Sequence, residues 1–78
     1  MHTVLCYSAV PRNLARTEWV GAIRCREVRE QGKSRNLWRR HTRIRRTTQD
    51  AAIQDAIDFC RDIQHESSGV DITIKPGT

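Results

Sequence analysis

The clearest pattern in the sequence is an apolar stripe with helical spacing near its C-terminal end. Between Thr48 and Gln64, apolar residues recur three or four positions apart and polar residues fill the opposite side. Thr47 or Thr48 can cap the first backbone N–H groups, and Asp50 suits the positive end of a helix. The sequence therefore predicts an amphipathic helix over about 48–64. Its stripe consists of Ala52, Ile53, Ala56, Ile57, Cys60 and Ile63.

Short segments rich in β-branched and alternating apolar residues surround this helix. One helix cannot bury its stripe alone, so a sheet formed by these segments must cover it. The expected fold class is α+β, a three- to four-stranded antiparallel sheet with one helix packed on one face, in the order β-β-β-α-β. The whole chain, 1–78, is expected to form one domain. The strands are expected at about residues 3–10, 18–28, 36–46 and 70–74.

The third expected strand has two different faces. Trp38 and Ile44 fall on one parity, and basic side chains alternate on the other. If the helix covers the Trp38 side, the basic side chains project together on the opposite side. In the second strand, Gly21 either weakens the strand or marks a close approach by the helix. The residues of the second strand expected to face the helix are Trp19, Gly21, Ile23 and Cys25.

Charge is strongly segregated along the chain, although the net charge is only +5. Residues 24–46 contain ten Lys and Arg against two Glu, a net charge of +8. Residues 47–78 contain two basic and six acidic residues, a net charge of −4. The molecule is thus a basic middle joined to an acidic helix and tail.

The basic face of the predicted sheet is the strongest functional signal. Arginines two positions apart on neighbouring strands project in parallel, and each phosphate that they neutralise releases counterions. The planar guanidinium also fits a phosphate or a guanine edge, and a strand ribbon can enter a major groove. The sequence therefore predicts non-catalytic binding of nucleic acid or another polyanion, with Arg40 and Arg46 reaching phosphates from the strand edges. The predicted binding residues are Arg24, Arg26, Arg39, Arg40, His41, Arg43, Arg45 and Arg46.

Two alternatives remain open. The basic residues can form a solvated face paired with Glu18, Glu27, Glu30 or a partner's acidic helix. The chain can also be a small protein-interaction module, or a homodimer joined through the final strand or the helix edge. Trp19 and Trp38 are better explained by core packing than by stacking on bases, since few aromatic residues are available to the core.

Several function classes lack support. The three cysteines are odd in number and contain no C-x-x-C pair, so we expect reduced thiols in a cytoplasmic protein, no disulfide framework and no metal site. No signal peptide or membrane-spanning run is apparent, so no membrane partner is expected. No acid–base pair or nucleophile constellation appears, so neither an enzyme nor a cofactor is expected. DNA or RNA preference is left open.

The segment T-x-D-A-A-I-x-D-A-I-D-F-x-R, from Thr48 to Arg61, resembles small uncharacterised bacterial proteins with a β-rich front and a terminal helix. This resemblance implies a fold and little else. The chain departs from it at Cys60, where glycine is expected, and in the strand expected after Gly69.

The predicted topology is also similar to integrase arm-type DNA-binding modules, in which a three-stranded sheet packed on one helix enters the major groove. The matching features are Trp19-x-x-x-Ile23-Arg24 and the helix start at Thr48. The resemblance implies DNA binding through the sheet, and it is an analogy at the level of fold.

Overall fold

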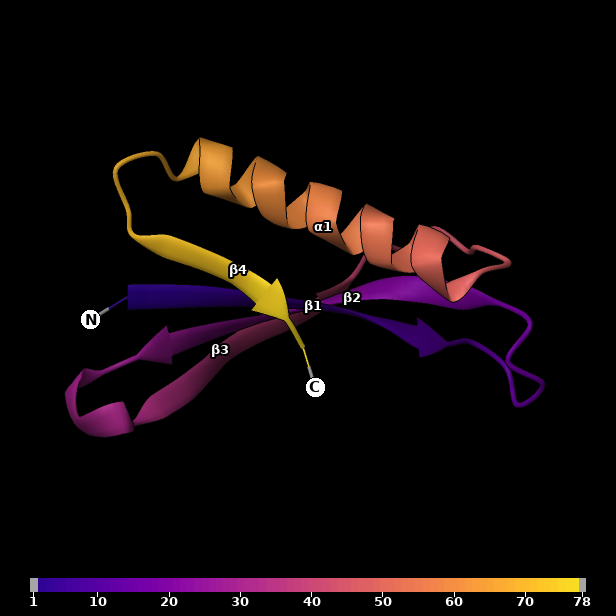
Figure 1. Ribbon diagram of the computed structural model, residues 1–78, viewed down its shortest axis with the longest axis horizontal. Coiled ribbons are helices and arrows are strands. Elements are labelled where there is room, and N and C mark those ends of the chain that lie inside the picture. The colour runs from indigo at the N-terminus through magenta and orange to yellow at the C-terminus, as the bar shows by residue number, and fades with distance from the viewer. Residues whose placement is uncertain (1, 78) are drawn as a thin grey trace.

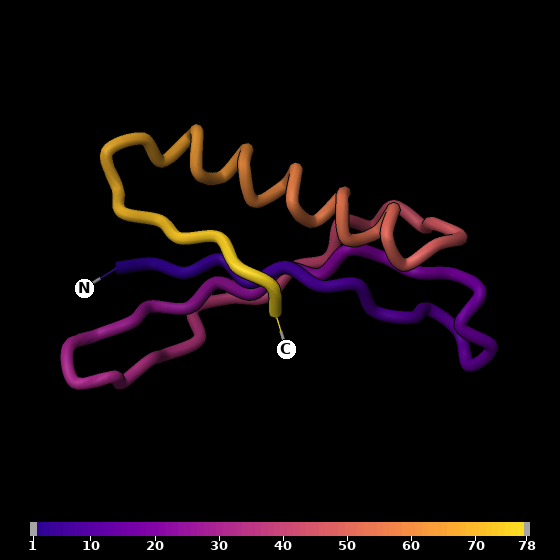
Figure 2. The backbone as a smooth tube through the Cα atoms, viewed as in Figure 1, coloured from indigo at the N-terminus to yellow at the C-terminus, as the bar shows by residue number. Residues whose placement is uncertain are grey.

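The computed structural model describes residues 2–77 and has the predicted α+β composition, with α1 lying across one face of a four-stranded sheet (Figure 1). A short 3-10 turn, Glu30–Gly32, joins the second and third strands. Figure 2 shows this turn at one end of the sheet and the β1–β2 turn at the opposite end. The elements are β1 (His2–Pro11), β2 (Trp19–Val28), β3 (Ser34–His41), α1 (Gln49–Glu66) and β4 (Ile72–Pro76).

The sheet is mixed, with the strand order β3-β2-β1-β4. β1 and β3 each pair with β2 in the antiparallel sense, as predicted. β4 pairs with β1 in the parallel sense, so the prediction of an entirely antiparallel sheet is wrong for this strand. The reason is the connection through α1: a helix that crosses the sheet returns the chain in the direction of the strand before it, which makes β4 parallel to both β3 and β1.

α1 begins and ends close to the predicted residues. Thr48 is the N-cap, and its Oγ1 accepts a hydrogen bond of 3.2 Å from the backbone N–H of Ala51. Asp50 lies in the first turn, where its negative charge suits the helix dipole. The side that faces the sheet buries Ala52, Ala56 and Cys60, which are members of the predicted stripe.

The core lies between α1 and one face of the sheet. Leu5, Ile23 and Cys25 from the strands pack with Ala56 and Cys60 of the helix. The small helix residues allow a close approach of the two layers. Tyr7, Trp38, Phe59, Ile63, Ile72 and Ile74 are half-buried around this cluster.

Gly21 marks the closest approach of α1 to the sheet, one of the two predicted explanations for this glycine. A Cβ at this position would lie 2.7 Å from the Ala52 carbonyl oxygen and 3.0 Å from the Ala56 Cβ. No side chain fits in that space, so only glycine allows the helix to lie on β2 here.

β3 is shorter than predicted. It ends at His41 rather than near residue 46, and a bulge opposite Cys25 and Arg26 interrupts its register. Thr42 still donates its backbone N–H to the Gly21 carbonyl at 2.9 Å, after which the chain leaves the sheet. The expected cover of Ile44 by the helix is therefore incomplete, and this side chain is 47% exposed.

All three cysteines, Cys6, Cys25 and Cys60, are free and buried. Burial raises the pKa of the Cys25 thiol, and it raises the pKa of Cys60 to about 11. Within residues 2–77, no helix has the length and apolar character needed to cross a bilayer.

Candidate nucleic-acid interface

The face of the sheet turned away from α1, called here the outer face, carries basic side chains and no strand carboxylate. Leu5, Ile23 and Cys25 face the helix, so strand alternation directs their sequence neighbours to the outer face. Glu27 is the only acidic residue in the four strands, and it shares the helix-facing parity of Cys25. The outer face comprises His2, Val4, Cys6, Ser8, Val10, Val20, Ala22, Arg24, Arg26, Val28, Ser34, Asn36, Arg39, His41, Thr73 and Lys75.

A row of basic residues crosses the sheet on this face. Arg39 of β3 is the direct partner of Arg24 on β2, and Arg24 is the partner of Cys6 on β1. Cys6 is in turn the partner of Lys75 on β4. The structure thus aligns three cations across four strands, as predicted for Arg24 and Arg39. Like charges directly opposite each other destabilise a sheet, so this alignment is an electrostatic cost to the fold.

The floor between the basic side chains is apolar and covered. Val4 and Val20 are only 3% and 2% exposed although they lie on the outer face. Long Arg and Lys side chains bury their aliphatic stems along such a floor while the charged ends remain in water. Arg26 lies on the same face, and its guanidinium donates a 2.6 Å hydrogen bond to the Ser34 hydroxyl.

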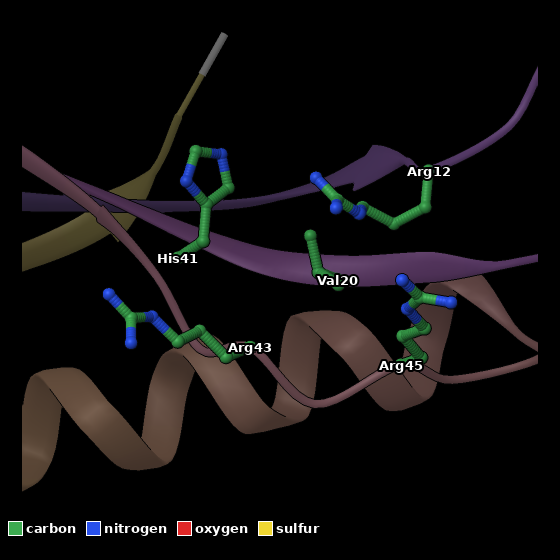
Figure 3. Close-up of a pocket in the computed structure, with 5 residues that line it drawn as sticks. All are labelled: Arg12, Val20, His41, Arg43 and Arg45. Atoms are coloured by element: carbon green, nitrogen blue, oxygen red, sulfur yellow. The ribbon is translucent and has the colours of Figure 1, made fainter.

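At one end of the outer face lies a hollow of about 410 Å³, called here the basic hollow. Val20 forms its floor, and Figure 3 shows four basic side chains placed around this valine. They come from separate parts of the chain: Arg12 follows β1, His41 ends β3, and Arg43 and Arg45 follow His41. Three of the four are residues predicted from the sequence.

Backbone geometry at Arg43 helps to form the basic hollow. Its φ is +63°, in the left-handed region that non-glycine residues rarely adopt. The chain bulges away from β2 here and returns at Arg46, which exchanges backbone hydrogen bonds of 2.7 and 2.8 Å with Trp19. Arg43 and Arg45 lie in this bulge and line the basic hollow as a consequence.

A smaller depression of about 130 Å³ shares His41 with the basic hollow. Small side chains, Ser8, Val10 and Ala22, contribute to its lining, with Arg24 and Arg39 at its border. The two depressions are together called here the trough. One or the other is lined by Arg12, Arg24, Arg39, Arg40, Arg43 and Arg45.

Two of the predicted residues have other contacts. Arg40 has the helix-facing parity of Ile23 and its guanidinium stacks over the Trp38 ring at 5.1 Å, but it also lines the smaller depression beside Arg24 and Arg39. Arg46 makes a two-point ion pair with Asp55 of α1, at 2.7 and 3.0 Å. These hydrogen bonds raise the pKa of the Arg46 guanidinium. Arg46 therefore fastens the bulge to the helix rather than joining the outer face.

Most of the remaining predicted residues have no acidic partner. Arg45 approaches Glu18 only loosely, at 3.8 Å, with 65% of its side chain exposed. No ion pair involves Arg24, Arg39 or Arg43 within residues 2–77. The first alternative, basic residues paired with Glu18, Glu27 or Glu30, applies to Arg29, which pairs with Glu27 at 2.9 Å, and only loosely to Arg45 with Glu18; Arg46 pairs with Asp55 instead.

Sequence reasoning missed two basic residues of this face, Arg12 and Lys75. Arg12 follows Val10 by two positions, so extending the alternation of β1 past Pro11 indicates its side. Lys75 alternates with Ile74 in β4, but its place beside Cys6 depends on the parallel pairing that was not predicted.

The aromatic side chains belong to the helix side of the sheet, although Phe59 also lines a depression with Arg39 and His41. Tyr7, Trp38 and Phe59 pack against the core, and Trp19 is half-buried with the helix-facing parity of Gly21. Core packing is thus confirmed for Trp38. Within residues 2–77, no group of three or more His, Cys, Asp and Glu side chains is arranged to hold a metal ion.

Comparison with known proteins found no match for this chain among family models, curated proteins or solved structures.

Proposed function

We propose that this protein binds nucleic acid without catalysis, through the outer face of its sheet. The observation that carries this proposal is the direct opposition of Arg24 and Arg39, with no carboxylate of the strands on the same face. An anionic backbone lying along the trough relieves their repulsion, and the release of its counterions drives association.

The character of the face favours recognition of the phosphate backbone over recognition of bases. Stacking of bases requires aromatic platforms, and the aromatic rings belong to the helix side of the sheet. The floor offers small side chains such as Ser8, Val10 and Ala22, over which sugars can pass while guanidinium groups contact phosphates. We therefore expect affinity that depends strongly on salt and weakly on sequence.

One observation favours a second candidate, association with another copy of the chain. An acidic depression on the helix side, with Asp58 and Asp62 beside Ile44 and Phe59, is complementary in charge to the outer face. Head-to-tail contact between the two surfaces would give a protein-interaction function and occupy the same arginines. The two candidates therefore predict different behaviour on heparin.

Electrophoretic shift assays with duplex DNA, single-stranded DNA and RNA, each at several salt concentrations, test the first candidate. The logarithm of the affinity should fall linearly with the logarithm of salt, with a slope of about −0.9 per contacted phosphate on duplex DNA. Replacing Arg39, Arg43 and Arg45 together by alanine should weaken binding and reduce that slope by about three.

The matched control is Arg61→Ala, because Arg61 is exposed on α1 and lies outside the outer face. It removes one positive charge, as each substitution in the triple variant does, and should leave the salt-dependence slope nearly unchanged. Equal binding by the triple variant and the parent protein would show that the outer face is not the binding surface. A stable dimer that is not retained on heparin would support the second candidate instead.

A further inference from the structure

The basic hollow brings together cations from separate segments of the chain at one end of the outer face. Across the strands, cations form a row at the spacing of neighbouring strands. In the basic hollow, three guanidinium groups and one imidazole surround a single concave space of about 410 Å³. Figure 3 shows the Arg12 and Arg45 guanidinium groups beside Val20, whereas the Arg43 guanidinium extends away from it.

This arrangement matches a different phosphate from the one inside a strand. A phosphodiester carries one negative charge and continues into the chain on both sides. A phosphate monoester carries about −1.5 to −2 charges near neutral pH and presents three free oxygens. Several exposed arginine side chains that can turn toward one bound group satisfy three oxygens better than they satisfy the two free oxygens of a diester.

The bulge that supplies Arg43 and Arg45 is held at both ends. Thr42 is hydrogen-bonded to Gly21 through its backbone N–H, at 2.9 Å, and through its side chain, at 3.2 Å. At the other end, Arg46 is fixed by Trp19 and Asp55. The left-handed backbone of Arg43 lies between these anchors. A strained conformation held by its surroundings is typical of ligand sites that are organised before the ligand arrives.

We propose that the basic hollow is a subsite for the terminal phosphate monoester of a nucleic-acid strand, with the adjoining nucleotides lying along the trough. This inference rests on the proposed nucleic-acid binding and adds the end of the strand as its preferred target. Arg12, Arg43 and Arg45 contact the terminal phosphate, His41 stands where the basic hollow meets the trough, and Arg24 and Arg39 contact internal phosphates.

Fluorescence anisotropy with short single-stranded DNA labelled at the opposite end tests this inference. Strands with a 5′ or 3′ phosphate are compared with strands that end in hydroxyl groups. A hydroxyl-ended strand that is two nucleotides longer controls for the added charge. We expect one of the phosphate-ended strands to bind about tenfold more tightly than the longer control, the effect of one charge-assisted hydrogen bond.

Variants distinguish recognition of the terminal phosphate from general binding of the strand. Arg12→Ala and Arg43→Gly should abolish the preference for a terminal phosphate while hydroxyl-ended strands still bind. Arg24→Ala should weaken binding of both kinds of strand by the same factor and preserve the preference. Circular dichroism of each variant establishes that it is folded before its affinity is compared.

Three results would overturn the subsite. One is equal affinity for phosphate-ended strands and the longer control while both bind, a result that leaves the proposed function intact. Another is equally strong competition by a nucleoside monophosphate alone, because the trough then contributes nothing. The last is stronger competition by a phosphoserine peptide, which would assign the basic hollow to a protein ligand. Absence of binding to every strand would remove the proposed function and the subsite together.

Discussion

Arg24 and Arg39 face each other as direct partners on antiparallel strands β2 and β3, on the side of the sheet that α1 does not cover. Neither has an ion-pair partner within residues 2–77. Two like charges in this position lower the stability of the free protein. An anion that binds across Arg24 and Arg39 relieves this repulsion and therefore stabilises the protein.

This pairing predicts that stability and binding respond oppositely to one substitution. Arg39→Glu replaces the repulsion with a cross-strand ion pair to Arg24, and should raise the free energy of unfolding by about 0.2–1 kcal/mol. The same change places a negative charge beside the trough and should weaken nucleic-acid binding strongly. Urea unfolding and a shift assay at one salt concentration measure the two effects. A loss of stability would show that the two side chains do not repel each other in the folded protein.

A second opposite response of stability and binding is expected at Arg43, whose backbone is left-handed. Arg43→Gly removes that strain at the cost of a more flexible unfolded chain, for a net gain of roughly 0.5–1 kcal/mol in the free energy of unfolding. Arg43→Ala keeps the strain and should give no such gain. Thermal unfolding compares the two variants.

The control for Arg43 is Arg16, a second arginine with positive φ, at +56°, in the turn between β1 and β2. Arg16→Gly should give a similar gain in stability. Because Arg16 does not line the basic hollow, its variant should keep the preference for a terminal phosphate. If both variants lost that preference, the preference would not depend on the Arg43 side chain.

The parts of this structure that sequence could predict follow from local periodicity. The helical stripe fixed the buried side of α1, and alternation placed Trp38 and Arg39 on opposite faces of β3. Gly21 stood out because a glycine inside a strand needs a reason, and the close approach of Ala52 supplies it. Each of these inferences depends on residues near one another in the chain.

The basic hollow depends instead on where a strand stops and on contacts between distant segments. Alternation alone carries β3 past His41 and gives no sign that Arg43 turns out of the ladder. The ion pair that joins Arg46 to Asp55 likewise links the bulge to the helix through space. The direction of β4 was mistaken for a related reason, since it follows from the course of the whole α1 connection.

Gly21 provides a direct test of the contact between α1 and β2. Gly21→Ala brings a methyl group within 2.7 Å of a carbonyl oxygen of the helix, and a backbone atom cannot move aside cheaply. We expect the free energy of unfolding to fall by about 1–3 kcal/mol, and Gly21→Ser to be at least as damaging. Chemical denaturation measures both. Unchanged stability in the alanine variant would mean that the helix lies farther from the sheet.

The buried thiols predict how stability changes at alkaline pH. Burial raises the pKa of Cys60 from its ordinary value near 9 to about 11, and it raises the pKa of Cys25 in the same direction. Well below pH 9 both thiols are protonated in the folded and the unfolded chain, so they cause no change in the free energy of unfolding. As the pH rises from 9 to 11, the unfolded chain releases these protons first, and the free energy of unfolding falls.

Denaturant unfolding at several pH values between 8 and 11 measures this fall, with the thiols kept reduced. Cys60→Ala is the matched variant: it should be less stable near neutral pH because it leaves a cavity, and its stability should fall less steeply with pH. Other groups titrate in this range in both proteins, so the difference between the two curves isolates the thiol. Parallel curves would show that Cys60 ionises as easily in the folded protein as in the unfolded chain.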